Sequence, residues 1–171
     1  MNELFNTTIY LNSTDNKYRY AIGTRGKNTL YCFGVNPSTA TPEKYDPTIT
    51  RVQQVALRKG FDSFVMLNLY PLRATNPNEL PDIPDNKIIS NNQDVIFHLP
   101  IARGSTVWAA WGNLVNSRDW LASCRDSIIS ELKYLNLSWV KMGDLTKTGN
   151  PRHPLYLKYQ EFSEYIIKEG K

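Results

Sequence analysis

Three short apolar runs constrain the fold of this chain more than any other feature of its sequence. They occupy residues 29–35, 63–69 and 106–111, and residues 138–141 could form a fourth strand. A strand with one face in water alternates apolar and polar residues, whereas a nearly continuous apolar run is expected where both faces of a sheet are covered. The runs therefore predict a parallel sheet.

The segments between these runs carry helical signals. The clearest one begins at Asp46-Pro47, ends at Gly60 and has apolar side chains at helical spacing in between, namely Ile49, Val52, Val55 and Ala56. Asp as N-cap, Pro at the first position and Gly just past the end are typical of a helix. Further helices are expected within residues 86–102, 118–135 and 155–169. Strands that alternate with such helices indicate βαβ units.

Two β-prone runs precede this pattern. Residues 7–11 and 18–24 flank a polar turn at residues 12–16 and predict an N-terminal β-hairpin. No internal repeat, low-complexity tract or shift in composition marks a domain boundary. A length of 171 residues is ordinary for one domain. We therefore expect a single domain over residues 1–171.

Composition limits the classes of function. Lys and Arg number 20 against 16 Asp and Glu, and the formal net charge of +4 is a mild bias toward polyanions such as nucleic acid. Cys32 and Cys124 are too few and too far apart for a disulfide framework or a zinc site, so we expect reduced thiols, no metal and no cofactor. The N-terminus lacks a basic-then-apolar signal, and no run approaches the ~18 apolar residues of a membrane span. We expect a cytoplasmic monomer.

Unusual residues follow the ends of the predicted strands. They are the segments 34–38 (GVNPS), 111–113 (WGN) and 149–154 (GNPRHP), together with Asn68. Each has an ordinary structural explanation, since Asn-Pro-Ser is a common turn and a His before Pro can simply lead into a helix. In an open parallel sheet, however, all four would meet in one crevice beyond the carboxyl ends of the strands, where ligands bind.

The strand-end segments resemble motifs of the uracil-DNA glycosylase superfamily. Residues 32–37 (CFGVNP) are similar to its first motif, in which a strand runs into Gly-x-Asp/Asn-Pro. Residues 65–68 (VMLN), followed by 71–74 (PLRA), are similar to the strand whose Asn reads uracil. Residues 110–112 (AWG) resemble its Trp-Gly turn.

Two further segments extend the resemblance. His153-Pro154 is similar to the start of the second signature motif, and residues 46–49 (DPTI) stand where those enzymes have a Pro-rich loop at the DNA backbone. The order and approximate spacing of all these elements agree over residues 29–157. The resemblance implies a three-layer α/β sandwich with a central, mostly parallel four-stranded sheet, helices on both faces and an N-terminal β-hairpin.

The resemblance also implies roles for residues in the crevice. Asn36 would position the hydrolytic water, and His153 would stabilise the negative charge on the departing base. Asn68 would read the base, because its amide oxygen can accept from N3–H of uracil while its nitrogen donates to O4. Gly34 and Ser38 would line the base-binding pocket.

Nucleic acid is the partner that the resemblance implies. The contacts would come from the DNA-backbone loop, from the wedge that follows the second motif, and from two arginines beside the motifs that could meet phosphates. These residues are Pro47, Thr48, Leu155, Tyr156, Arg73 and Arg152. Acidic proteins that mimic DNA inhibit enzymes of this fold, so an acidic protein is a second candidate partner.

The chain departs from the superfamily at positions that matter for catalysis. The most active glycosylases have Asp where this chain has Asn36, and a neutral amide supplies no negative charge to the oxocarbenium-like transition state. The mismatch-processing branch also has Asn there. Ser38 replaces the bulky Tyr that excludes thymine, and no counterpart of the Phe that stacks on the flipped base is found, Tyr45 being the only aromatic residue in the segment 38–46.

A closer resemblance connects the chain to a bacterial family classed only as a domain of unknown function, through the motifs NPSTA and GxPxHPLYL. Three functions remain open. The chain could bind nucleic acid or an acidic DNA-mimicking protein without efficient uracil excision, and we favour this hypothesis. It could be an active DNA N-glycosylase in DNA repair that acts on a mismatched or damaged base, or a hydrolase of free nucleosides or nucleotides.

Overall fold

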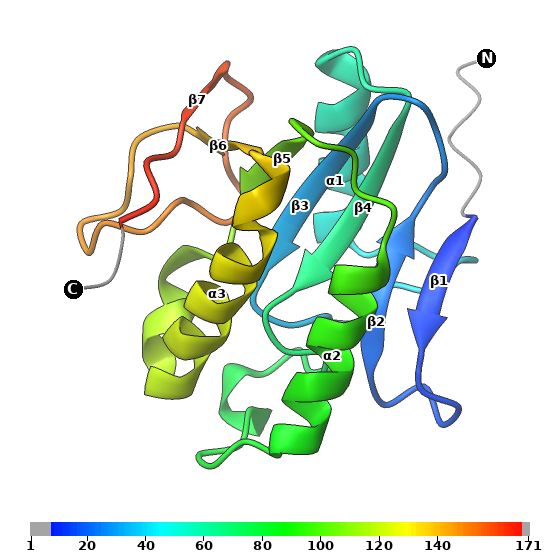
Figure 1. The fold of residues 1–171 in the computed structure, drawn as a ribbon, viewed down its shortest axis with the longest axis vertical. Coiled ribbons are helices and arrows are strands. Elements are labelled where there is room, and N and C mark those ends of the chain that lie inside the picture. The colour runs from blue at the N-terminus through cyan, green and yellow to red at the C-terminus, as the bar shows by residue number, and fades with distance from the viewer. Residues whose placement is uncertain (1–7, 169–171) are drawn as a thin grey trace.

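A mixed sheet forms the centre of the molecule. The computed structural model describes residues 8–168. Four parallel strands occupy the middle of the sheet: β3 (Thr29–Gly34), β4 (Ser63–Asn68), β5 (Thr106–Ala109) and β6 (Ser138–Met142). Within the described residues the sheet has seven strands in the order β1-β2-β4-β3-β5-β6-β7 (Figure 1). The predicted parallel sheet is therefore confirmed, but the expected four strands are only its centre.

The predicted N-terminal hairpin is present and widens the sheet. β1 (Ile9–Asn12) pairs antiparallel with β2 (Arg19–Gly23), and β2 pairs antiparallel with β4. Thr7, which the sequence places in this hairpin, lies outside the described residues. The hairpin thus belongs to the sheet itself because its second strand covers the edge of β4.

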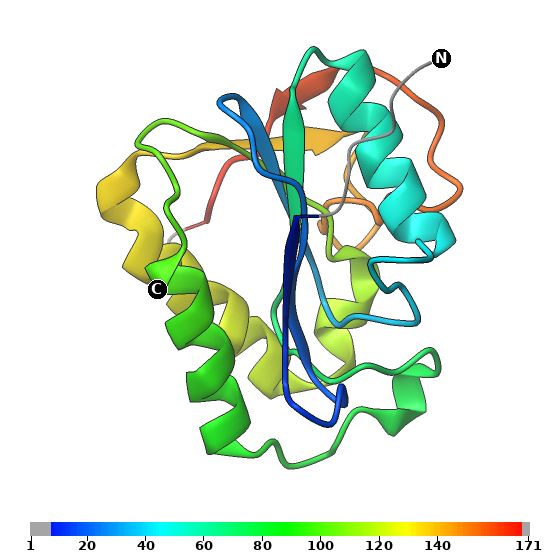
Figure 2. The same ribbon diagram turned by 90° about the vertical axis from the view of Figure 1, so that its right-hand side faces the viewer.

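Helices cover both faces of the sheet, as predicted. α1 (Pro47–Arg58) begins after Asp46, whose side chain accepts a hydrogen bond from Ile49 N at 2.9 Å, and Gly60 follows it with a φ of +83°. α2 (Asn86–His98) and α3 (Asp119–Glu131) lie on the opposite face (Figure 2). Between residues 8 and 168 there are also three 3₁₀ turns: η1 (Pro77–Glu79), η2 (Gly112–Ser117) and η3 (Leu132–Leu135).

Each face of the sheet has its own apolar core. Side chains alternate along every strand, so Phe33 and Leu67 face α2 and α3, whereas Cys32 and Met66 face α1. Burial raises the pKa of the Cys32 thiol well above its ordinary value and that of Cys124 to about 11, and both thiols are free. None of the helices between residues 8 and 168 is long and apolar enough to cross a membrane.

The predicted last helix, over residues 155–169, is wrong. Residues 154–156 form a turn, in which Leu157 N donates to Pro154 O, and the following residues contain no helix but the strand β7 (Phe162–Glu164), which pairs antiparallel with β6. From residue 157 to 160 half-buried and exposed positions alternate, which is the period of an extended chain. Contacts with α1 hold this segment, since Arg51 Nη2 donates to Leu157 O and Lys59 Nζ lies 2.7 Å from Glu161 Oε2.

Candidate functional site

The carboxyl ends of β3, β4 and β5 bring the unusual residues toward one edge of the sheet. Gly34 pairs in register with Asn68, and Phe33 pairs with Ala109. A Cβ atom at Gly34 would lie 3.2 Å from Asn68 Oδ1 and 2.8 Å from Met66 Cε. Gly34 therefore leaves the space that the Asn68 side chain occupies on the α1 face of the sheet.

Asn68 is 1% exposed, and its Nδ2 atom has no hydrogen-bond acceptor among residues 8–168. Its main chain is well held, because Asn92 on α2 donates through Nδ2 to the carbonyl oxygens of Asn68 at 2.9 Å and of Leu69 at 3.3 Å. The position that the sequence assigned to base reading thus carries a buried, unsatisfied donor on a rigid strand end.

Asn36 holds the loop that follows β3. Its Nδ2 atom lies 2.9 Å from Ala74 O, 3.1 Å from Pro37 O and 3.3 Å from Leu72 O. The described residues donate no hydrogen bond to its Oδ1 atom. The amide nitrogen is therefore engaged in structure, and only the amide oxygen remains for the water that the sequence assigned to this residue.

Arg73 also holds this loop rather than standing free for phosphate. Its guanidinium donates from Nε to Ser38 O and from Nη2 to Thr39 O, each at 3.0 Å, and from Nη1 to the Tyr10 hydroxyl at 3.2 Å. The Ser38 hydroxyl lies 2.9 Å from that of Thr75. Both Ser38 and Arg73 are thus parts of one hydrogen-bonded loop.

Arg19 on β2 also holds this loop, and little in the sequence marks it as a site residue. It is 1% exposed on β2, and its Nη1 atom donates to Ala40 O at 3.2 Å. Burial lowers the pKa of Arg19 to about 10, and the nearby carboxylate of Asp46 opposes that change. Asp46 accepts from Ala40 N at 3.3 Å, so the loop is held from both sides. The one signal in the sequence is a charged residue within a β-prone run.

His153 packs against the Trp-Gly turn. Gly112 has a φ of +60°, and a Cβ atom there would lie 3.3 Å from His153 Cβ. Leu155 N donates to His153 Nδ1 at 3.1 Å, so in the neutral ring the proton is on Nε2. The residue lies at the surface, yet partial burial of its ring lowers the pKa of His153, against a smaller opposing effect of Asp46. The neutral imidazole is therefore a hydrogen-bond donor through Nε2.

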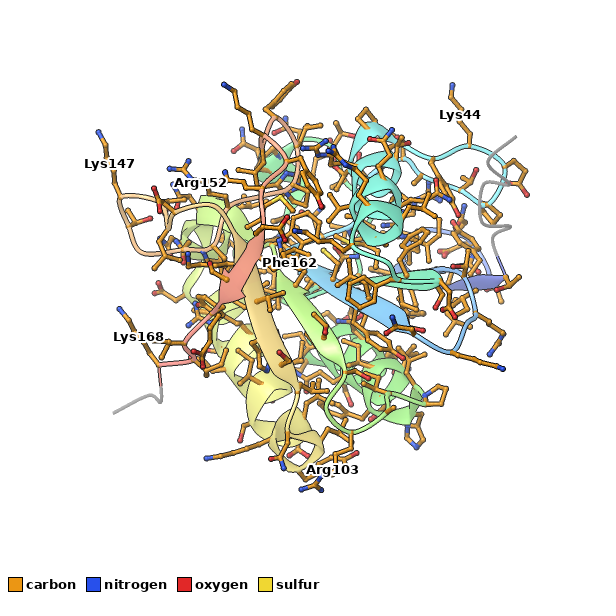
Figure 3. All side chains as sticks on the ribbon, turned by 90° about the horizontal axis from the view of Figure 1, so that it is seen from above. Lys44, Arg103, Lys147, Arg152, Phe162 and Lys168 are labelled. Carbon is orange, nitrogen blue, oxygen red and sulfur yellow. The ribbon has the colours of Figure 1, made fainter. Side chains whose placement is uncertain are left out.

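A crevice of about 310 Å³ adjoins His153 and brings together four of the predicted site residues. It is lined by Gly112, Asn113, Thr146, Arg152, His153, Leu155, Tyr156 and Leu157. Tyr156 is 96% exposed and has a φ of +63°. Arg152 donates through Nε to Asp144 O at 2.8 Å and lies on the loop after β6 (Figure 3). Asn36, Ser38 and Asn68 do not line this crevice.

Helix α1 contacts one residue of the same crevice. Pro47 is exposed and Thr48 half-buried, and Arg51, one turn further on, donates to the carbonyl of the crevice residue Leu157. The helix that begins with the predicted DNA-backbone residues is thus bound to the segment that follows the predicted wedge residues. Among residues 8–168 no group of three or more His, Cys, Asp or Glu side chains could hold a metal ion.

Comparison with known proteins gives one family. The model of the family described as "Protein of unknown function (DUF1643)" matches residues 19–155. The chain belongs to this family. No curated protein and no solved structure matches it significantly. The DUF1643 region contains all four strand-end segments and ends within the crevice, at Leu155.

Proposed function

We propose that this DUF1643 chain binds nucleic acid and holds an unstacked base at the strand-end site without efficient excision of uracil. The observation that carries the proposal is the Nδ2 donor of Asn68, which is buried without an acceptor. Leaving such a donor unsatisfied costs about 1–3 kcal/mol, and most buried polar groups in proteins are satisfied. A carbonyl oxygen of a base would provide the acceptor.

Two residues of the crevice add support. The Nε2–H of neutral His153 can donate to a carbonyl of a base that enters the crevice, and the exposed ring of Tyr156 lines the same crevice. A tyrosine with positive φ is uncommon because the side chain crowds its own backbone, and such strain is often found at functional sites.

The same site lacks an obvious source of negative charge for base excision. Asn36 is neutral, and none of the residues between 8 and 168 that line the crevice is acidic. The carboxylate of Asp46 is held at the start of α1 by Ile49 N and Ala40 N, so we expect weak stabilisation of a developing positive charge. A second candidate is a DNA N-glycosylase for a mismatched or damaged base, and the free Oδ1 of Asn36 favours it because that atom could orient a water molecule.

The test uses fluorescently labelled single-stranded and duplex oligonucleotides with uracil, hypoxanthine or a mismatch, in both binding and base-release assays. We expect salt-sensitive binding without release. Asn68→Leu, which keeps the side-chain shape but removes the donor, should weaken binding at least tenfold, whereas the exposed Asn78→Leu should leave it unchanged.

The other outcomes separate the alternatives. Base release that is lost in both Asn36→Ala and His153→Ala would establish the glycosylase instead. Capture of only an acidic protein, with no oligonucleotide bound, would replace nucleic acid by a protein partner. Equal binding by wild type and Asn68→Leu would remove the base-reading role.

A further inference from the structure

A second and larger cavity lies on the other side of the loop that carries His153. This groove, of about 960 Å³, is formed by α3, β6 and the segment after β7. Its volume is at the upper end of the range for small-molecule sites, roughly 300–1,000 Å³. The residues that matter for its chemistry are Trp139, Tyr165, Asn150, Ile166 and Lys168.

Trp139 and Tyr165 provide rigid aromatic surface in this groove. Both are half-buried, and the centroids of their rings lie 6.2 and 5.6 Å from that of the fully buried Trp111. Side chains packed in this way lose little further conformational freedom when a ligand binds. Aromatic residues of this kind stack on bases of single-stranded nucleic acid, whatever the sequence.

Asn150 adds an unused acceptor to the groove. It is 6% exposed, and its Nδ2 atom donates to Asn113 Oδ1 and to Thr148 Oγ1, at 3.2 Å each. No residue between 8 and 168 donates to its Oδ1 atom. An N–H group of a base is a suitable donor for that oxygen.

The crevice and the groove meet at a single ridge. Thr146 lines the crevice and Thr148 lines the groove, and both hydroxyls donate to Asn113 Oδ1 at 2.7 Å. The two hydroxyl oxygens are 3.2 Å apart. The crevice and the groove are therefore adjacent, and only this hydrogen-bonded ridge separates them.

Cationic side chains are placed for the phosphates of such a strand. Lys147 is exposed at the top of the ridge, between Thr146 and Thr148, and Lys168 stands at the rim of the groove. Figure 3 shows Lys147, Arg152 and Lys168 on one side of the molecule, with both lysines extending outward. Phosphate contacts of this type supply most of the sequence-independent affinity for nucleic acid.

We propose that the groove binds the nucleotide next to the one held at the crevice, so that a single strand crosses the ridge at Lys147. This inference rests on the proposed function and narrows its substrate to single-stranded nucleic acid. The base in the groove stacks on Trp139 and Tyr165, and the phosphate between the two bases lies over Lys147.

The experiment has a cross-linking arm and an affinity arm. Single-stranded oligonucleotides with one photoreactive thiothymidine are irradiated with the full chain, and the modified peptide is identified by mass spectrometry. We expect adducts at Trp139 or Tyr165. In anisotropy titrations Ile166→Glu, which places a negative charge at an exposed position of the groove, should weaken binding roughly tenfold, in keeping with the loss of one stacked base.

Controls keep the result specific to the groove. Ile83→Glu makes the same change at an exposed residue that lines neither cavity, and should bind as wild type does. Lys147→Ala should lower the slope of log affinity against log salt by about 0.7.

Several outcomes would overturn the inference. One is binding with adducts only at crevice residues and no effect of Ile166→Glu. Another is tight binding of free nucleotides in the groove while single-stranded oligonucleotides do not bind there. Failure of the proposed function is a different result, because then wild type binds no oligonucleotide at all.

Discussion

At the scale of single residues, Asn68 and Asn92 are two buried amides at the same strand end, and the same substitution should affect stability differently at each. Asn68→Leu removes a buried donor that has no acceptor, so we expect the free energy of unfolding to stay the same or rise by about 1 kcal/mol. Asn92→Leu removes two hydrogen bonds to β4 and should lower it by about 1–3 kcal/mol. Urea denaturation measures both, and an equal loss in the two variants would mean that Asn68 has an intramolecular acceptor.

His153 gives a residue-scale prediction about pH. Partial burial lowers its pKa in the folded chain, while the unfolded chain keeps the ordinary value of about 6.5. Between the two values the unfolded state binds more protons, so stability is fully present above about pH 6.5 and declines as pH falls toward the folded pKa.

An NMR titration of the imidazole signals measures this pKa. The chain has two histidines, and replacing the exposed His98 by Gln leaves His153 as the one histidine signal in the spectrum. We expect a midpoint below 6.5, and a His153→Gln variant whose stability changes less over this range. A midpoint at or above 6.5 would contradict the burial of the His153 ring as the cause of a lowered pKa.

At the scale of elements, the loop after β3 depends on an arginine from another part of the chain. Arg73→Ala removes three hydrogen bonds to Ser38, Thr39 and Tyr10. We expect a loss of about 2 kcal/mol in the free energy of unfolding, since hydrogen bonds to charged groups are stronger than average. Hydrogen exchange should become faster for the amides of the loop.

Arg152→Ala is the matched control for that change. Its guanidinium makes one hydrogen bond, to Asp144 O, and the residue is exposed, so the stability change should stay within about 0.5 kcal/mol. A similar cost for both variants would show that the loop does not depend on Arg73.

The elements also show what sequence can and cannot predict. α1 was predictable because its signals are local, an Asp N-cap, a Pro and a terminal Gly within one short segment. The non-helical chain over residues 155–168 was not, because it is stabilised by distant parts of the sequence, namely the edge of β6 and Lys59 at the end of α1. Tertiary contacts outweighed local propensity there.

In the candidate site, too, features with a local sequence signal could be predicted and features that depend on contacts between distant segments could not. Motif order placed Asn68 at the carboxyl end of a strand in the parallel sheet, and chain direction alone is enough for that inference. The engagement of Asn36 and Arg73 by backbone carbonyls could not be predicted, because it depends on where three loops lie relative to one another. The ridge at Asn113 was missed for the same reason.

At the scale of the whole molecule, the segment beyond the family region completes one of the two cores. The DUF1643 match ends at residue 155, yet Leu157, Tyr159 and Phe162 pack against the apolar cluster on the α1 face. Arg58 and Lys59 lie over the ring of Tyr159 at 3.6 and 4.7 Å from its centroid, which adds cation–π attraction. The fold thus depends on residues outside the region that the family model matches.

Phe162→Ala tests this dependence. The Phe162 ring lies 5.5 Å from that of the buried Trp108 and beneath Lys59, on a strand that pairs with β6 (Figure 3). We expect the free energy of unfolding to fall by about 2 kcal/mol, less than for a fully buried Phe because this one is half-buried. Ile166→Ala changes an exposed side chain of the same segment and should cost less than about 0.5 kcal/mol. Because this segment forms walls of both cavities, Phe162→Ala should also weaken oligonucleotide binding. If the free energy of unfolding of Phe162→Ala were unchanged, the apolar core on the α1 face would not need residues 156–168 for its stability.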